Sequence, residues 1–98
     1  MRQPPLDPDA ADEAPVADML TPYDYEHLVT YLRLLDAEAI ELDWKEAART
    51  ILRIDPDREL ARARFSWESH MRRAYWMTEE GYRHLLRLSQ LTLAGVAE

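Results

Sequence analysis

The sequence ARARFSWESHMRRAYWMTEEGYRHLLR, residues 61–87, decides the fold, because most of it has the spacing of one long helix with two contrasting faces. Side chains three and four positions apart share one face of a helix. This spacing predicts a core-facing stripe made of Leu60, Ala63, Trp67, His70, Met71, Ala74 and Met77. It predicts an outer face in which four arginines surround two large aromatic rings: Arg58, Arg62, Phe65, Ser69, Arg72, Arg73 and Trp76.

Three interpretations of this outer face are open. It is a solvated charged face with Phe65 or Trp76 tucked under a neighbouring helix, a recognition helix that contacts DNA, or a protein interface. Arginine and aromatic residues supply much of the binding energy at protein interfaces. Phe65 favours a protein partner, since a phenylalanine in the middle of the face cannot hydrogen-bond to a base edge. The net charge of −7 favours it too, because non-specific DNA affinity comes mostly from neutralising phosphates.

The segment TPYDYEHLVTYLRLLDAEA, residues 21–39, predicts an earlier helix over about 22–40. Thr21 is a suitable N-cap and Pro22 suits the first helical position. Asp24 is favourable at the positive start of a helix. The apolar residues that follow at three- and four-residue steps predict one buried stripe: Tyr25, Leu28, Tyr31, Leu32, Leu35 and Ala39.

Two further helices and a turn are expected after this one. Asp43 caps a short helix over about 44–53. Pro56 separates that helix from the long one, which is expected to start at about 57 with Asp55 as its cap and to end at about 78. Gly81 is expected to act as a C-terminal breaker, and a final helix follows with Tyr82, Leu85, Leu86, Leu88 and Leu91. The sequence therefore predicts an all-α, small four-helix domain containing a helix-turn-helix-like pair.

Charge and composition divide the chain. Residues 1–43 hold eleven acids and two bases, so the acidic surplus lies in the first part. Residues 1–20 hold four of the six prolines and too few large apolar side chains to offset the entropy cost of ordering. We expect a disordered acidic tail over 1–20, a helical helix-turn-helix-like domain over 21–92 and a flexible C-terminus over 93–98.

Catalytic and metal-binding motifs are missing from the sequence. It contains no cysteine, no HExxH, no glycine-rich phosphate loop and no serine nucleophile elbow. His27, His70 and His84 are spread over three expected helices and are interpreted as packing or surface residues rather than metal ligands. No apolar run has the length of a membrane span. We expect a cytoplasmic protein with no membrane partner, no enzymatic activity, no catalytic residue, no cofactor, no metal ion and no small-molecule ligand.

Three segments resemble the small helical domain of RovC-type transcription factors, formerly a domain of unknown function. They are TPYDYEHLVTYLRLLDAEA, DWKEAARTILRIDP and RARFSWESHMRRAYWMTEEGYRHLL, and the closing WMTEEGYRHLL is the most specific part. The resemblance covers about residues 21–88. It implies a helix-turn-helix DNA-binding module whose second helix lies on 44–53 and whose recognition helix lies on about 57–77. The sequence departs from the DNA-binding pattern at Phe65, where arginine would be expected.

In size and acidic balance the chain is similar to stand-alone family members, the antiactivators of the QseM kind. These bind a transcriptional activator, FseA, and so repress excision and conjugative transfer of an integrative and conjugative element. The resemblance implies an antiactivator with an FseA-like activator as its partner and with weak DNA binding or none. The alternative is a helix-turn-helix DNA-binding transcriptional regulator. For the antiactivator, the expected partner-binding residues are Arg58, Arg62, Phe65, Ser69, Arg72, Arg73 and Trp76.

Overall fold

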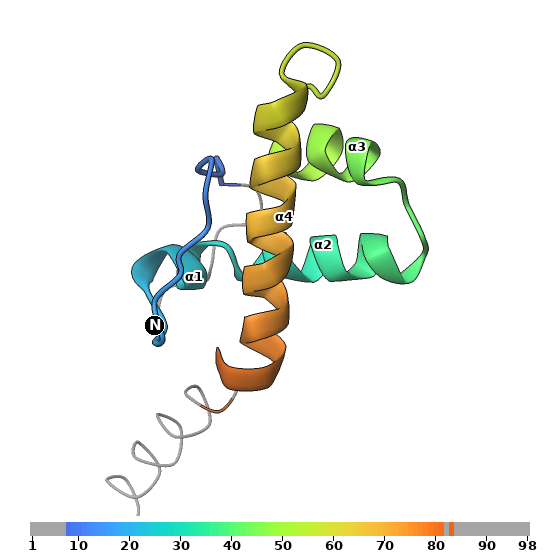
Figure 1. Cartoon of the computed structure of the whole chain (residues 1–98). Helices are drawn as coiled ribbons and strands as arrows, with labels where there is room; N and C mark the ends of the chain where they lie inside the picture. The colour runs from blue at the N-terminus through green and yellow to red at the C-terminus, as the bar shows by residue number, and fades with distance from the viewer. Residues whose placement is uncertain (1–7, 82, 84–98) are drawn as a thin grey trace, which may run out of the picture.

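Helices supply the regular structure in the computed structural model, which describes residues 8–81 and 83 (Figure 1). In chain order the elements are α1 (Pro22–Glu26), α2 (Leu28–Ala39), α3 (Trp44–Ala47), the π-helical segment η1 (Ala48–Leu52), α4 (Leu60–Trp76) and the π-helical segment η2 (Met77–Gly81). No strand occurs over 8–81. The prediction of a small all-α domain is confirmed.

The predicted first helix forms, but it breaks in two at His27. Thr21 Oγ1 accepts a hydrogen bond from the Asp24 N–H, and Asp24 Oδ2 accepts one from the Thr21 N–H at 2.9 Å, which is a capping box. His27 has φ −111° and ψ 22°, outside the α-helical range, so α1 ends there and α2 begins at Leu28. The capping residues in the sequence correctly predicted where the helix starts. The break at His27 was not predicted, because the apolar spacing continues through it.

The helix-turn-helix-like pair is present, with a longer connection than predicted. α3 and η1 together cover 44–52, and Asp43 caps α3 by accepting a hydrogen bond from the Lys45 N–H. Asp55 Oδ1 accepts from the Asp57 N–H in a turn, and α4 starts only at Leu60 rather than at about 57. The connection therefore spans 53–59. Both α3 and η1 pack against α4.

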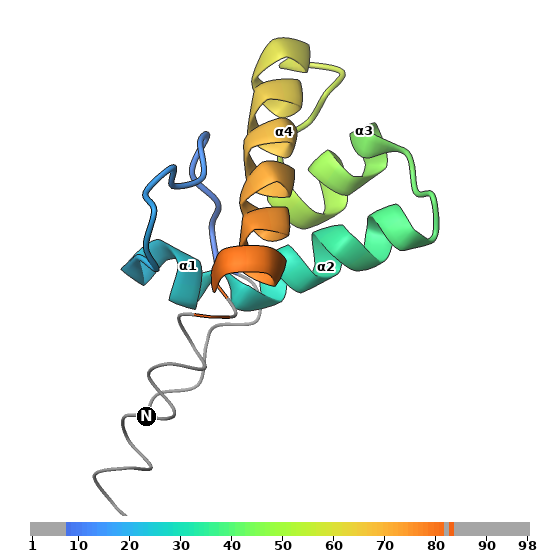
Figure 2. The same cartoon turned by 60° about the horizontal axis from the view of Figure 1, so that its bottom comes forward.

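α4 is the central element of the fold. α2, α3 and η1 pack against it, and in both views the N-terminal segment 8–20 lies on the opposite side of α4 from α3 (Figures 1 and 2). Of the predicted core stripe, Ala63, His70, Met71, Ala74 and Met77 are buried, and Trp67 packs against the core while partly buried. The prediction was wrong for Leu60, which is 54% exposed, because α4 begins at this residue and the core begins one turn later at Ala63.

Gly81, which the sequence predicted as a C-terminal breaker, does not adopt the left-handed conformation. It is the last residue of η2, and no glycine among the described residues has a positive φ. A Cβ at this position would lie 2.7 Å from Met77 Sδ and 3.1 Å from the Trp76 ring. Any larger residue would therefore displace the Met77 side chain from Trp76. The final predicted helix, which begins at Tyr82, lies outside the described residues apart from Arg83.

The N-terminal segment 8–20 corrects the expectation of a disordered tail. Its backbone is hydrogen-bonded to the helices: the Ala14 N–H donates to Ser69 Oγ at 3.0 Å, and the Ala11 N–H donates to Tyr23 Oη at 3.0 Å. Ala14 is buried. Polar side chains of α1 and α4 supply partners for an extended backbone, and a segment with few apolar residues can be ordered in that way. Residues 1–7 lie outside the described part.

A buried ion pair between Asp24 and Arg73 joins the first and last described helices. Arg73 Nε donates to Asp24 Oδ1 at 2.9 Å and Arg73 Nη2 donates to Asp24 Oδ2 at 2.5 Å, a bidentate arrangement. Tyr31 Oη of α2 donates to Asp24 Oδ1 at 2.7 Å. Arg73 also donates to the carbonyl oxygens of Ala17 and Met19. Burial alone would raise the pKa of Asp24, but the hydrogen bonds from Arg73, Tyr31 and Thr21 lower it below its ordinary value.

Removing one partner of this pair should destabilise the domain strongly. Arg73→Met leaves the Asp24 carboxylate buried without a counter-charge, and we expect a loss of about 3–5 kcal/mol in the free energy of unfolding, measured by urea denaturation at neutral pH. The matched control is Arg72→Met at the exposed neighbouring position, where we expect a change within about 0.5 kcal/mol. Equal losses in the two variants would contradict a structural role for the ion pair.

Candidate protein-interaction surface

The structure divides the seven residues predicted to form the partner-binding face. Arg58, Arg62, Phe65 and Arg72 are exposed, and Trp76 is half-buried. Ser69 and Arg73 are buried, so the prediction that they point outward was wrong. The reason is the N-terminal segment, which covers this part of α4 and was not expected to be ordered.

The segment that covers α4 brings its own acids and apolar residues to the helix. Asp12 Oδ1 accepts a hydrogen bond from Arg62 Nε at 2.8 Å. A pocket of about 270 Å³ lies between the segment and the helix, with Ala14, Pro15 and Val16 on one side and Arg72 and Trp76 among the residues on the other. Val16 is 77% exposed at this pocket. The candidate surface is therefore built from two chain segments that are distant in sequence.

Phe65 dominates the amino-terminal part of the same face. Its side chain is 49% exposed although it lies in the middle of a helix. Arg62, one turn earlier, lies beside it on the helix, and Ser69, one turn later, begins the covered region. Phe65 and the Val16–Trp76 pocket thus form an apolar strip with basic residues along it, which we name the α4 surface; it comprises Val16, Arg58, Arg62, Phe65, Arg72 and Trp76. Such a strip is typical of a protein interface.

Most arginines near α4 already form ion pairs within the chain. Arg62 pairs with Asp12 and Glu59, and Arg64 pairs with Glu68. Arg49 of η1 likewise pairs with Glu46 and Asp57. Arg58 and Arg72 form no ion pair with a described residue. Contact between α4 and a phosphate backbone would have to compete with several of these internal carboxylates.

A buried hydrogen-bonded network under the N-terminal segment was missed at the sequence level. Tyr23 Oη lies 2.6 Å from His70 Nε2, and His70 Nδ1 lies 2.8 Å from the Ser66 carbonyl oxygen. His70 therefore donates through Nδ1 and accepts from Tyr23, which is the neutral form of the ring. The ring of His27 stacks on Tyr23 at 3.8 Å, and its Nε2 lies 3.0 Å from the Asp9 carbonyl oxygen. Two histidines predicted merely to pack thus hold the segment in place.

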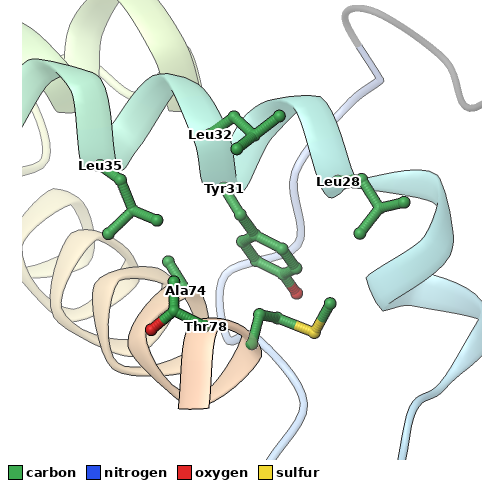
Figure 3. Close-up of a pocket in the computed structure, with 7 residues that line it drawn as sticks. Leu28, Tyr31, Leu32, Leu35, Ala74 and Thr78 are labelled. Carbon is green, nitrogen blue, oxygen red and sulfur yellow. The ribbon is translucent and has the colours of Figure 1, made fainter. Parts of the chain in front are cut away.

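A second apolar surface lies between α2 and the end of α4. Figure 3 shows Leu28, Leu32 and Leu35 of α2, with Tyr31, around a space that Ala74 and Thr78 also line. The cavity measures about 510 Å³. Leu32, predicted to be buried, is 61% exposed here, and Ala39 is exposed as well. The predicted stripe of α2 is therefore only partly covered by the described residues.

Among the described residues, no three potential metal ligands are grouped together. None of the helices over 8–81 combines the length and the apolar character that crossing a bilayer requires. Among these residues the α4 surface, with its exposed phenylalanine and its pocket, is the arrangement best suited to binding a macromolecule.

Comparison with known proteins identifies a family for this chain. The model of the RovC DNA-binding domain, described as the DNA-binding domain of a transcription factor of the type VI secretion system (T6SS), matches residues 5–87. The match includes the N-terminal segment 8–20, whereas the resemblance seen in the sequence covers only about residues 21–88. No curated protein matches the chain. The family description is at odds with the expectation of weak DNA binding or none.

The stability of the fold should depend on the protonation of His70. Burial lowers the pKa of His70 below its ordinary value of about 6.5, although its hydrogen bond to Ser66 opposes the effect. The unfolded chain then binds the proton more readily, so this contribution is complete above about pH 6.5 and is lost as the pH falls below it. We expect urea midpoints to fall more steeply between about pH 7 and about pH 5 in the wild type than in His70→Gln. His27 is common to both proteins, so equal slopes would mean that His70 is not responsible.

Proposed function

The chain belongs to the family of RovC DNA-binding domains of transcription factors, and on that premise we propose that it is an antiactivator, which binds a transcriptional activator through protein contacts. The observation that supports this most is the state of the arginines along α4. Arg62 and Arg64 are neutralised by the chain's own acids, while Phe65, which follows Arg64, is exposed. A helix with this arrangement offers a partner more apolar surface than unpaired positive charge.

The mechanism that we propose uses the α4 surface as one interface. Phe65 inserts into an apolar pocket of the activator, and the Val16–Trp76 pocket receives an apolar side chain in return. Arg58 and Arg72, which have no ion pair within the described part of the chain, pair with carboxylates of the activator. Fully desolvated aromatic residues flanked by arginine supply most of the binding energy in many interfaces. Occupying the activator in this way prevents it from acting at its promoter.

The identity of the partner follows from resemblance rather than from geometry. The chain is similar in size and acidic balance to stand-alone antiactivators, whose partner is an FseA-like activator built from related domains. We propose such an activator as the partner, and repression of excision and conjugative transfer of an integrative and conjugative element as the outcome. The net charge of −7 suits a partner with a basic DNA-binding surface.

DNA binding is the second candidate, and the family description is the observation that favours it. The helix-turn-helix-like pair is present, and α4 would be the recognition helix. Arg58 and Arg72 would then contact phosphates. Arg62 would have to exchange its carboxylate partner for phosphate oxygens, and so would the other paired arginines of α4. This exchange and the net charge of −7 both make DNA binding less favourable.

Activator capture should depend on the α4 surface. In pull-downs with a purified FseA-like activator, we expect Phe65→Ala to weaken binding about tenfold or more, since a tenfold loss corresponds to about 1.4 kcal/mol and truncating a hot-spot anchor typically costs about 2 kcal/mol or more. Arg58→Glu should weaken it as well, because it reverses a charge that has no ion pair with any described residue. The matched controls are Tyr75→Ala, which removes an exposed aromatic side chain of α4 outside this surface, and Arg33→Glu on α2. Unchanged capture by both test variants, with helicity preserved, would rule out the proposed interface.

DNA affinity should be weak and should not decide function. In fluorescence-anisotropy titrations with promoter duplex, we expect no saturable binding at micromolar protein and physiological salt. Asp12→Asn, which frees Arg62 from one carboxylate, should increase the anisotropy change at low salt only. Tight, sequence-specific and salt-sensitive binding by the wild type would instead establish the second candidate function.

A further inference from the structure

A groove on the other side of α4 has a different composition from the α4 surface. It lies where the end of α2 meets α3, away from the N-terminal segment (Figure 1). Its volume is about 480 Å³. The buried side chains of Leu34, Ala37 and Ala47 lie at its floor. Leu42 and the indole rings of Trp44 and Trp67 supply its accessible apolar surface, and the groove as a whole has mixed polarity.

The rim of this groove is acidic, and its acids have no internal counter-charge. Glu38, Glu41 and Asp43 all line the groove and are exposed. None of them forms an ion pair with a residue in the described part of the chain. This contrasts with α4, whose arginines are mostly paired. Residues 34–44 contain four acids and no base, so a cationic group entering the groove meets uncompensated negative charge.

Glu41 occupies a backbone position that usually belongs to glycine. Its φ is +59°, in the left-handed region. The turn has the Schellman pattern, in which the Glu41 N–H donates to the Glu38 carbonyl and the Leu42 N–H donates to the Ala37 carbonyl, both at 2.9 Å. A side chain here makes the left-handed conformation less favourable than glycine would. The fold therefore carries a carboxylate at the groove at some cost in stability.

The two tryptophans already accommodate one guanidinium group. The Arg64 guanidinium carbon lies 4.9 Å from the ring centroids of both Trp44 and Trp67, and the two centroids are 6.0 Å apart. Arg64 does not line the groove. Arginine stacks on aromatic faces and pairs with carboxylates through a planar fork, whereas lysine does so less well.

We propose that this groove docks an arginine-bearing apolar segment of a protein partner. Apolar side chains of the segment pack on Leu42, which is 39% exposed, and on the partly buried indoles, and its arginines pair with Glu38 and Glu41. The groove proposal rests on the proposed function, because that function supplies the partner. A basic region of the activator would provide the arginines that the groove binds. With the α4 surface, the antiactivator would hold its partner on two sides of α4.

A peptide titration of the full chain tests the groove without the activator. The probe is an amphipathic peptide of arginine, leucine and alanine, followed by ¹H–¹⁵N NMR. We expect saturable shifts centred on residues 38–47 and the indole N–H groups of Trp44 and Trp67. The same peptide with lysine in place of arginine should bind more weakly, and the version with glutamine should not bind.

Charge variants show whether the peptide binds to the carboxylates of the groove or is attracted by the net negative charge of the protein. Glu38→Gln combined with Glu41→Gln should weaken binding about threefold to tenfold. The matched control, Glu26→Gln with Glu79→Gln, changes the net charge equally at two exposed positions outside the groove and should change affinity far less. Equal losses in both double variants, shifts centred elsewhere, or no saturable binding would overturn the proposal.

Glu41→Gly separates binding from folding. We expect this variant to melt at a higher temperature than the wild type, because glycine adopts the left-handed conformation freely, and yet to bind the peptide more weakly. A variant that melts higher and binds as well as the wild type would show that Glu41 has no role in docking. Activator capture distinguishes the two proposals: capture that depends on Phe65 but not on Glu38 and Glu41 would leave the proposed function intact and remove the groove from it.

Discussion

The buried pair of Asp24 and Arg73 is the interaction on which the rest of the structure depends. Both side chains are almost completely buried, and every polar atom of the pair has a partner in α1, α2, α4 or the N-terminal segment. A charge at this depth is tolerated only when it is paired and hydrogen-bonded throughout. The pair therefore fixes how α1 crosses α4, and through Arg73 it also fixes the course of residues 17–19.

That course explains the character of the α4 surface. Because the segment is held along α4 by Arg73, Ser69 and the Tyr23–His70 network, its acidic residues are presented to the helix. Asp12 is then placed against Arg62, and Val16 beside Trp76. Without the segment this surface of α4 would be basic. With the segment in place, a carboxylate neutralises Arg62 and apolar side chains lie beside it. The hydrogen bonds that order the N-terminal segment are therefore also the cause of the partner preference that we propose.

The sequence was sufficient for the helices and for much of the core, because apolar spacing and capping residues are local signals. Thr21, Asp43 and the stripe from Ala63 to Met77 were assigned correctly on these grounds. It was not sufficient for Arg73, Ser69 or the N-terminal segment. A helical wheel places Arg73 outside, whereas Asp24, forty-nine positions earlier, and the carbonyl oxygens of Ala17 and Met19 hold it inside. Backbone hydrogen bonds to polar side chains leave no hydropathy signal, so composition alone suggested disorder.

In this domain the residues that hold the core are largely distinct from the exposed residues that we propose meet a partner. Asp24, Tyr31 and Arg73 hold one another in the core, and of the α4 surface Trp76 lies against Arg73, whereas Arg62 and Phe65 are exposed. At those positions a few residues decide whether the helix offers free positive charge: Asp12 and Glu59 beside Arg62, and Phe65 on the exposed face. Ion pairs between exposed groups are individually weak, and their removal costs the fold little. In this chain the arginines of α4 are mostly neutralised by its own acids, which favours the protein-binding role that we propose over contact with DNA.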